Sequence, residues 1–207
     1  MDAAPQDPAP QDPAPQDPAP QDPAEGAPTV ALTVTSAEGM RDLGRRLAKM
    51  LRAGDLVMLS GELGAGKTTL TRGLGEGLGV RGAVTSPTFV IARVHPSLGD
   101  GPPLVHVDAY RLGGGLDEME DLDLDVSLPA SVIVVEWGEG KVEELTEDRL
   151  HLRIERTTGA TGSGGNGGGA STGDTGDTGD TGDDVRRVTL TGLGARWSTA
   201  DLNALAA

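Results

Sequence analysis

The chain has 207 residues, no cysteine and a formal net charge of −15, with 17 Lys and Arg against 32 Asp and Glu. The lack of cysteine excludes disulfides and thiolate metal sites, and the acidic balance leaves no basic surface that would bind nucleic acid unaided. No apolar run approaches the roughly 20 residues of a membrane helix, and the N-terminus lacks the pattern of a signal peptide, so we expect a cytoplasmic protein without membrane contact.

Two stretches differ in composition from the rest and are expected to be disordered. Residues 1–28 repeat Pro-Gln-Asp-Pro-Ala and hold almost nothing apolar larger than Ala, so they cannot bury enough surface to offset their ordering entropy. Residues 157–184 are rich in Gly, Thr and Asp, a composition typical of a flexible coil. The two stretches carry eleven carboxylates and no Lys or Arg. The prediction is one domain made of residues 29–156 and 185–207, interrupted by a disordered insert.

The domain opens with a strand and a helix. Residues 30–34 (VALTV) read as a strand, and Thr35-Ser36-Ala37-Glu38 has the spacing of a capping box that begins a helix reaching about residue 52. The apolar run at residues 56–60 (LVMLS) predicts a strand buried on both faces of a parallel sheet. A second helix is expected from Thr68 to about Leu78.

Between this strand and this helix lies Gly61–Thr68 (GELGAGKT), which matches the phosphate-binding motif G-x-x-x-x-G-K-[ST] in its required context. Glycines allow the backbone N–H groups to point at phosphates, and the helix N-terminus adds partial positive charge. Lys67 would supply a cation for the β- and γ-phosphates, and the Thr68 hydroxyl would ligate Mg²⁺. The residues expected to bind the nucleotide are Leu63, Gly64, Ala65, Gly66, Lys67 and Thr68.

Hydroxyl-bearing residues follow the second helix. Residues 85–89 (TSPTF) are expected to form a loop, in which Thr88 would meet the γ-phosphate as a switch residue does. The alternative is an ordinary turn, since Ser-Pro-Thr is common in turns. A strand is expected through residues 90–94 (VIARV).

Two later strand candidates each end in a carboxylate. Residues 104–112 (LVHVDAYRL) begin as an alternating strand and reach Asp108, which would act on Mg²⁺ or on the attacking water, or else be a surface acid. The run at residues 131–135 (SVIVV) stops at Glu136, the arrangement of a Walker B strand. Because ligands of open α/β sheets bind at the carboxyl ends of strands, we expect Glu136 to face the phosphate-binding loop. The alternative is a strand-end acid with no ligand.

The C-terminal part predicts two antiparallel strands, at residues 149–156 and 184–192, joined by the insert. The three histidines, His95, His106 and His151, show no metal-ligand spacing, so ordinary surface or strand roles are expected for them.

The ordered series GELGAGKTT, SPTF, HVDAYRL, an acidic Leu-rich helix over residues 116–124 and VVEWGE resembles the TsaE family in motif order, spacing and chain size. The resemblance covers residues 30–156. It implies an α/β fold, a small P-loop NTPase with a mostly parallel central sheet flanked by helices, plus C-terminal antiparallel strands. It also implies Mg-ATP binding, with metal contacts from Thr68 and Glu136 and functional weight on Asp108 and Trp137.

The resemblance implies a role as well. TsaE-like proteins act with TsaD and TsaB, and TsaD transfers the threonylcarbamoyl group to the adenosine beside the anticodon of tRNA. This chain would contribute ATP binding and hydrolysis, with Lys67, Asp108 and Glu136 as catalytic residues, and would meet tRNA only through the complex. Three of the four aromatic residues lie in the motifs. We expect Phe89 to pack under a loop and Trp137 to couple the nucleotide state to a partner surface.

Other functions use the same loop. A small-molecule kinase needs an acceptor pocket and usually a mobile lid with arginines, for which no segment is evident. A GTPase needs an Asn-Lys-x-Asp motif, which does not occur, so adenine is favoured. A nucleotide-dependent interaction module with little hydrolysis remains open. Since no arginine finger can be assigned, we expect turnover to be slow until partners bind.

Overall fold

The computed structural model describes residues 26–112, 122–157 and 185–206. Its strands are β1 (Thr29–Val34), β2 (Leu56–Ser60), β3 (Ala92–His95), β4 (Leu104–Asp108), β5 (Val132–Glu136), β6 (Arg149–Arg156) and β7 (Arg186–Leu193). Its helices are α1 (Ala37–Ala48), α2 (Lys67–Leu78) and the short α4 (Leu124–Ser127), with 3₁₀ turns η1 (Ala109–Arg111), η2 (Leu128–Ala130) and η3 (Leu202–Ala206). None of the described helices is long and apolar enough to cross a membrane.

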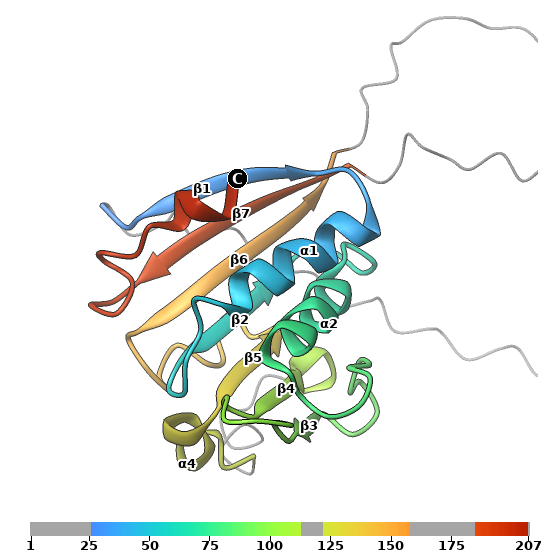
Figure 1. Ribbon diagram of the computed structural model, residues 1–207, viewed down its shortest axis with the longest axis vertical. Helices are drawn as coiled ribbons and strands as arrows, with labels where there is room; N and C mark the ends of the chain where they lie inside the picture. Colours follow the sequence, from blue (N-terminus) through green and yellow to red (C-terminus); the bar gives the residue numbers. More distant parts are fainter. Residues whose placement is uncertain (1–25, 113–121, 158–184, 207) are drawn as a thin grey trace, which may run out of the picture.

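The strands form one mixed sheet in the order β1-β7-β6-β2-β5-β4-β3 (Figure 1). The four central strands β6, β2, β5 and β4 are mutually parallel, whereas β1, β7 and β3 pair antiparallel at the two edges. The α/β class with a mostly parallel centre and C-terminal antiparallel strands is therefore confirmed. Because the carboxyl ends of the parallel strands meet at one edge of the sheet, the loops that follow β2, β4 and β5 converge there.

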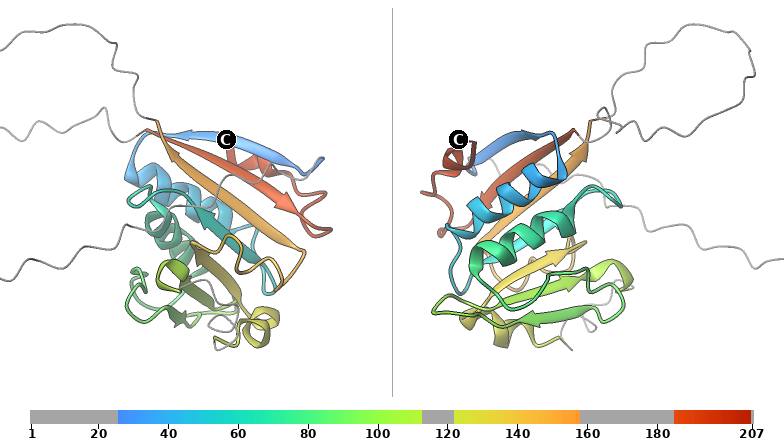
Figure 2. Two further views of the ribbon diagram at one scale, coloured as in Figure 1. Left: turned by 180° about the vertical axis from the view of Figure 1, so that it is seen from behind. Right: turned by 45° about the vertical axis from the view of Figure 1, so that its right-hand side comes forward.

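Helices α1 and α2 pack side by side on one face of the sheet (Figure 2). Leu43 and Leu47 of α1 and Leu70 and Leu74 of α2 form the larger core with Leu59 and other strand residues. A smaller core on the opposite face joins β2, β4 and β5 to α4, η1 and η2. All five residues of β4 are buried. The predicted strand is therefore present, and both of its faces are covered although its sequence alternates.

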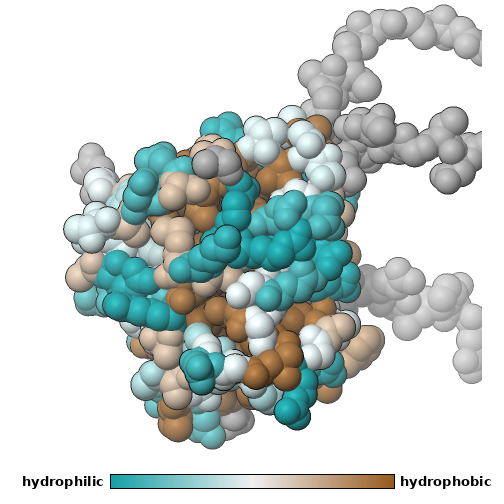
Figure 3. All heavy atoms as spheres, in the orientation of Figure 1, coloured by the Kyte–Doolittle hydropathy of each residue, from teal (hydrophilic) through white to brown (hydrophobic). Residues whose placement is uncertain are grey.

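The outward side of α1 is polar, as Figure 3 shows by the hydrophilic side chains gathered over this helix. Arg45 Nη1 lies 2.7 Å from Glu76 Oε2, and Arg41 pairs with the same carboxylate of α2. Hydrogen bonds from Arg41 and Arg45 lower the pKa of Glu76 below its ordinary value. This exposed network links the outer surfaces of the two helices.

The predicted start and end of α1 need correction. The cap is Ser36, whose Oγ accepts from the Gly39 N–H at 3.0 Å, rather than Thr35. Glu38 instead pairs with Arg45 at 2.6 Å, so no capping box forms. The helix ends at Ala48 rather than near residue 52, because the next N–H groups bond three residues back and tighten the last turn.

The strand predicted at residues 90–94 begins two residues later. The N–H groups of Val90 and Ile91 both donate to Pro87 O, and Ile91 has a φ of 65°, so a turn occupies the start of the predicted strand. The acidic helix predicted over residues 116–124 lies mostly outside the described residues. The predicted tail and insert do as well, and they stay predictions.

Candidate nucleotide site

The phosphate-binding loop joins β2 to α2 at the carboxyl edge of the sheet. Gly61 has a φ of 139°, and a Cβ there would lie 2.2 Å from Ile154 O, so glycine is required on both counts. Gly66 is the N-cap of α2 with a φ of 112°. The glycine pattern thus sets the loop geometry that the sequence motif predicted.

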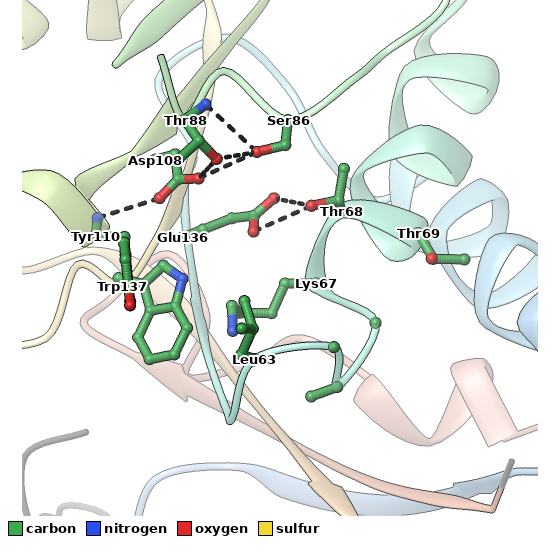
Figure 4. Close-up of a pocket in the computed structure, with 13 residues that line it drawn as sticks. Leu63, Lys67, Thr68, Thr69, Ser86, Thr88, Asp108, Tyr110, Glu136 and Trp137 are labelled. Atoms are coloured by element: carbon green, nitrogen blue, oxygen red, sulfur yellow. Dashed lines mark hydrogen bonds between the residues drawn. The ribbon is translucent and has the colours of Figure 1, made fainter. Parts of the chain in front are cut away.

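A cavity of about 360 Å³ opens beside this loop, at the ends of β4 and β5 (Figure 4). All ten residues that the sequence predicted for the site line it, from the loop, the switch segment and both strand ends. The lining is Leu63, Gly64, Ala65, Gly66, Lys67, Thr68, Thr69, Ser86, Thr88, Asp108, Tyr110, Glu136 and Trp137. The structure therefore brings the predicted residues together, whatever each of them does.

Glu136 faces the start of α2, as predicted. Thr68 Oγ1 donates to both carboxylate oxygens of Glu136, at 2.9 Å to Oε1 and 3.2 Å to Oε2. His106 Nε2 lies 2.8 Å from the same Oε1. An ordinary surface or strand role was expected for His106, and this contact was not predicted. A pairing of β4 with β5 is needed to find it, since His106 is two residues before Asp108, which pairs with Glu136.

Asp108 is 3% exposed, so its interpretation as a surface acid is wrong. Its Oδ2 accepts from Ser86 Oγ at 3.1 Å and from the Thr88 hydroxyl, and its Oδ1 accepts from the Tyr110 N–H at 3.1 Å. Figure 4 places this group across Glu136 from Lys67. The hydroxyl loop is thus fastened to Asp108 at the side of the cavity away from Lys67.

Lys67 and Trp137 are in contact. The Lys67 ammonium lies 3.6 Å from the ring centroid of Trp137, and it donates to Glu62 O at 3.1 Å and to Gly61 O. Trp137 adopts a φ of 62°, which is rare for a residue other than glycine, and its ring packs against Tyr110 at 5.2 Å between centroids. Backbone strain of this kind is concentrated at functional sites.

Phe89 does not pack under a loop as predicted. The side chain is 90% exposed, and the Arg111 guanidinium lies 5.6 Å from its ring centroid. The large ring that does fill the core is Trp197, which is completely buried between the sheet and the C-terminal turn.

The oxygen donors fit a nucleotide-bound Mg²⁺. The Thr68 hydroxyl and the Glu136 carboxylate lie at hydrogen-bond distance at the end of the phosphate loop. Mg²⁺ suits such a site, because it keeps several waters and uses one or two protein oxygens together with substrate phosphates.

A second hollow of about 190 Å³ lies on the other side of the same loop. Figure 4 shows Thr69 projecting away from Thr68 and Glu136, and Thr69 lines this hollow with residues of α1 and β7. Arg186 Nε donates to Ala65 O at 3.2 Å, and Arg156 Nη2 donates to Gly64 O at 2.9 Å. The ends of β6 and β7 therefore hold the tip of the loop.

A polar cluster supports the turn that carries Trp137. His151 Nε2 lies 3.2 Å from Glu139 Oε1 and bonds to Ser60 Oγ, so it joins β6 to the end of β2 and to the turn after β5. Burial raises the pKa of Glu139, but hydrogen bonds from His151 and Ser60 outweigh burial and leave this pKa below its ordinary value.

Comparisons with known proteins agree with one another. The family model described as threonylcarbamoyl adenosine biosynthesis protein TsaE matches residues 34–162. The tRNA threonylcarbamoyladenosine biosynthesis protein TsaE of Streptomyces coelicolor is 77% identical over 167 residues, covering 81% of this chain and 99% of that protein. The Mycobacterium tuberculosis protein of the same name is 48% identical over 132 residues, covering 61% and 79%. The crystal structure of Bacillus subtilis YdiB has a TM-score of 0.58 at 30% identity, covering 84% and 92%.

Proposed function

Because the chain belongs to the TsaE family, a family of threonylcarbamoyladenosine biosynthesis proteins, we propose that it binds and hydrolyses Mg-ATP in support of this tRNA modification. The observation that carries the proposal is the meeting of the phosphate loop with Asp108 and Glu136 in one cavity. The role of TsaD and TsaB as its partners is part of the proposal.

The phosphate loop would bind the triphosphate through its N–H groups and Lys67. Lys67 would exchange the carbonyls of Gly61 and Glu62 and the ring of Trp137 for phosphate oxygens, because an anion attracts the ammonium more strongly than neutral dipoles do. The hollow beside Thr69 and Arg186 would hold the ribose and base, since it borders the phosphate loop on the side away from Glu136.

The two carboxylates would divide the remaining work. Mg²⁺, when bound, would neutralise phosphate charge, and Thr68 and Glu136 would hold it. Asp108 would orient the attacking water together with the hydroxyls of Ser86 and Thr88, which it already binds. Lys67 is the one cationic side chain in the described lining of the cavity. We therefore propose slow turnover by the chain alone and faster turnover in complex with TsaD and TsaB.

The test is phosphate release by the purified chain from Mg-ATP with no added acceptor, with and without TsaD and TsaB. Wild type is expected to release phosphate slowly and to be stimulated by the partners, and Lys67→Ala is expected to release none. Lys49→Ala, at an exposed position, is the matched control and should behave as wild type. ATP binding without phosphate release under either condition would favour an interaction module, and no ATP binding would refute the proposal.

A further inference from the structure

His106 lies in the centre of the sheet on β4 and is completely buried, with 0% exposure. Its neighbours along the strand are Val105 and Val107, which are apolar and also buried. A buried imidazole is costly unless its polar atoms are bonded. A histidine at this buried position is therefore explained only if its ring nitrogens form a useful hydrogen bond.

The hydrogen-bond partner of His106 is the carboxylate of Glu136. His106 Nε2 is 2.8 Å from Glu136 Oε1, and within the described residues Nδ1 has no hydrogen-bond partner. The bond to Glu136 is thus the one hydrogen bond that the described residues give this ring. With a proton on Nε2, the imidazole donates to the carboxylate.

Two donors reach the Glu136 carboxylate, and they differ in what happens when a cation arrives. Thr68 Oγ1 donates to both oxygens, and this hydroxyl would have to turn a lone pair toward a cation that it held. His106 is held by the surrounding sheet, so its bond to Oε1 can remain. Oε2, which His106 does not contact, would then be available to hold the ion.

We propose that His106 is a positioning residue that fixes the orientation of Glu136 toward the nucleotide-bound Mg²⁺. The inference rests on the proposed function, since it needs Mg-ATP at this site. Donors that orient a metal-binding side chain commonly change metal affinity or activity by 10- to 100-fold when they are removed.

The experiment measures ATP affinity of the full chain by calorimetry, once with Mg²⁺ and once with EDTA in its place. His106→Leu is expected to weaken ATP binding about tenfold in Mg²⁺ and to leave it nearly unchanged in EDTA. His106→Gln, whose amide can still reach Oε1, should stay within about threefold of wild type in Mg²⁺. His106→Asn, whose side chain is too short to reach Oε1, should resemble His106→Leu. It provides the test if the leucine variant does not fold.

His95→Leu is the matched control, because His95 is also buried, lies on the adjacent strand β3 and does not line the cavity. It should bind ATP as wild type does under both conditions. Equal weakening of His106→Leu and His106→Asn with Mg²⁺ and with EDTA, or no weakening at all, would overturn the inference. If wild-type affinity itself did not depend on Mg²⁺, the proposed function would be in error instead.

Discussion

Contacts of single residues determine the position of the Lys67 side chain in the phosphate loop when no anion is bound. Lys67 lies against Trp137 and bonds to backbone carbonyls, so a nucleotide that drew Lys67 to its phosphates would change the surroundings of the indole. We predict that ATP changes the tryptophan emission of wild type and leaves that of Trp137→Phe unaltered, although Phe can still accept the ammonium over its ring. The measurement is a fluorescence titration, in which Trp197 is the internal reference because it is buried in the core away from the cavity. A signal that persists in Trp137→Phe would contradict the contact.

A second prediction concerns His95. Burial lowers the pKa of this imidazole below its ordinary 6.5, although a hydrogen bond that the ring donates to the Arg81 backbone opposes the effect. The unfolded chain therefore binds a proton first as the pH falls. The stability contribution of neutral His95 is complete above pH 6.5 and is lost as the pH drops through 6.5 toward the lower folded pKa. The low pKa of Glu139 acts in the same direction nearer pH 4.5.

Urea unfolding at pH 8 and pH 5.5 checks this expectation. The free energy of unfolding of wild type should be smaller at pH 5.5, and His95→Gln, which cannot titrate, should lose less over the same interval. An equal loss in both proteins would show that other groups cause the pH dependence.

Among the elements, the contact between α1 and α2 depends on glycine. A Cβ at Gly73 would lie 2.1 Å from Arg41 O, and one at Gly44 would lie 2.3 Å from Leu70 O, so the two backbones touch. We predict that Gly73→Ala lowers the free energy of unfolding by about 1–3 kcal/mol through overpacking, although alanine favours a helix by about 1 kcal/mol. Gly99→Ala, which faces open space, is the control. Unchanged stability of Gly73→Ala would mean that the helices separate at little cost.

The elements also show what could be predicted from the sequence. Continuous apolar runs located β2 and β5, because burial on both faces leaves no other pattern, and a local motif located the phosphate loop. The start of β3 was missed because Ile91 adopts a left-handed turn that its β-branched side chain does not suggest. The predicted cap of α1 was wrong by one residue, since Thr35 and Ser36 are chemically similar.

In the site, too, local features could be predicted from the sequence and contacts between distant segments could not. The carboxylates were predicted because Glu136 ends an apolar run and Asp108 ends an alternating strand candidate. The contacts that join them to other segments, His106 to Glu136 and Thr88 to Asp108, depend on strand order and loop path. The local sequence therefore predicts neither contact, and it does not predict the exposure of Phe89.

At the scale of the whole molecule, a buried ion pair ties the start of β2 to the segment after β7. Asp55, 2% exposed, accepts from Arg196 Nε and Nη2 at 3.1 Å, and Arg196 also donates to Met50 O at 2.8 Å. Asp55→Ala is expected to lower the free energy of unfolding by about 3 kcal/mol, because it leaves the guanidinium without its partner. Denaturant unfolding measures the change, with the exposed Asp100→Ala as control. A loss no larger than that of the control would show that the pair contributes little.

The most direct test of an ATP-dependent role in tRNA modification is made in cells. N6-threonylcarbamoyladenosine in tRNA is measured by nucleoside mass spectrometry after depletion of this protein, with wild type, Lys67→Ala or Lys49→Ala supplied in trans. We predict that depletion removes the modification and that wild type and Lys49→Ala restore it while Lys67→Ala does not. Unchanged modification after depletion, or restoration by Lys67→Ala, would contradict the role proposed for the nucleotide site.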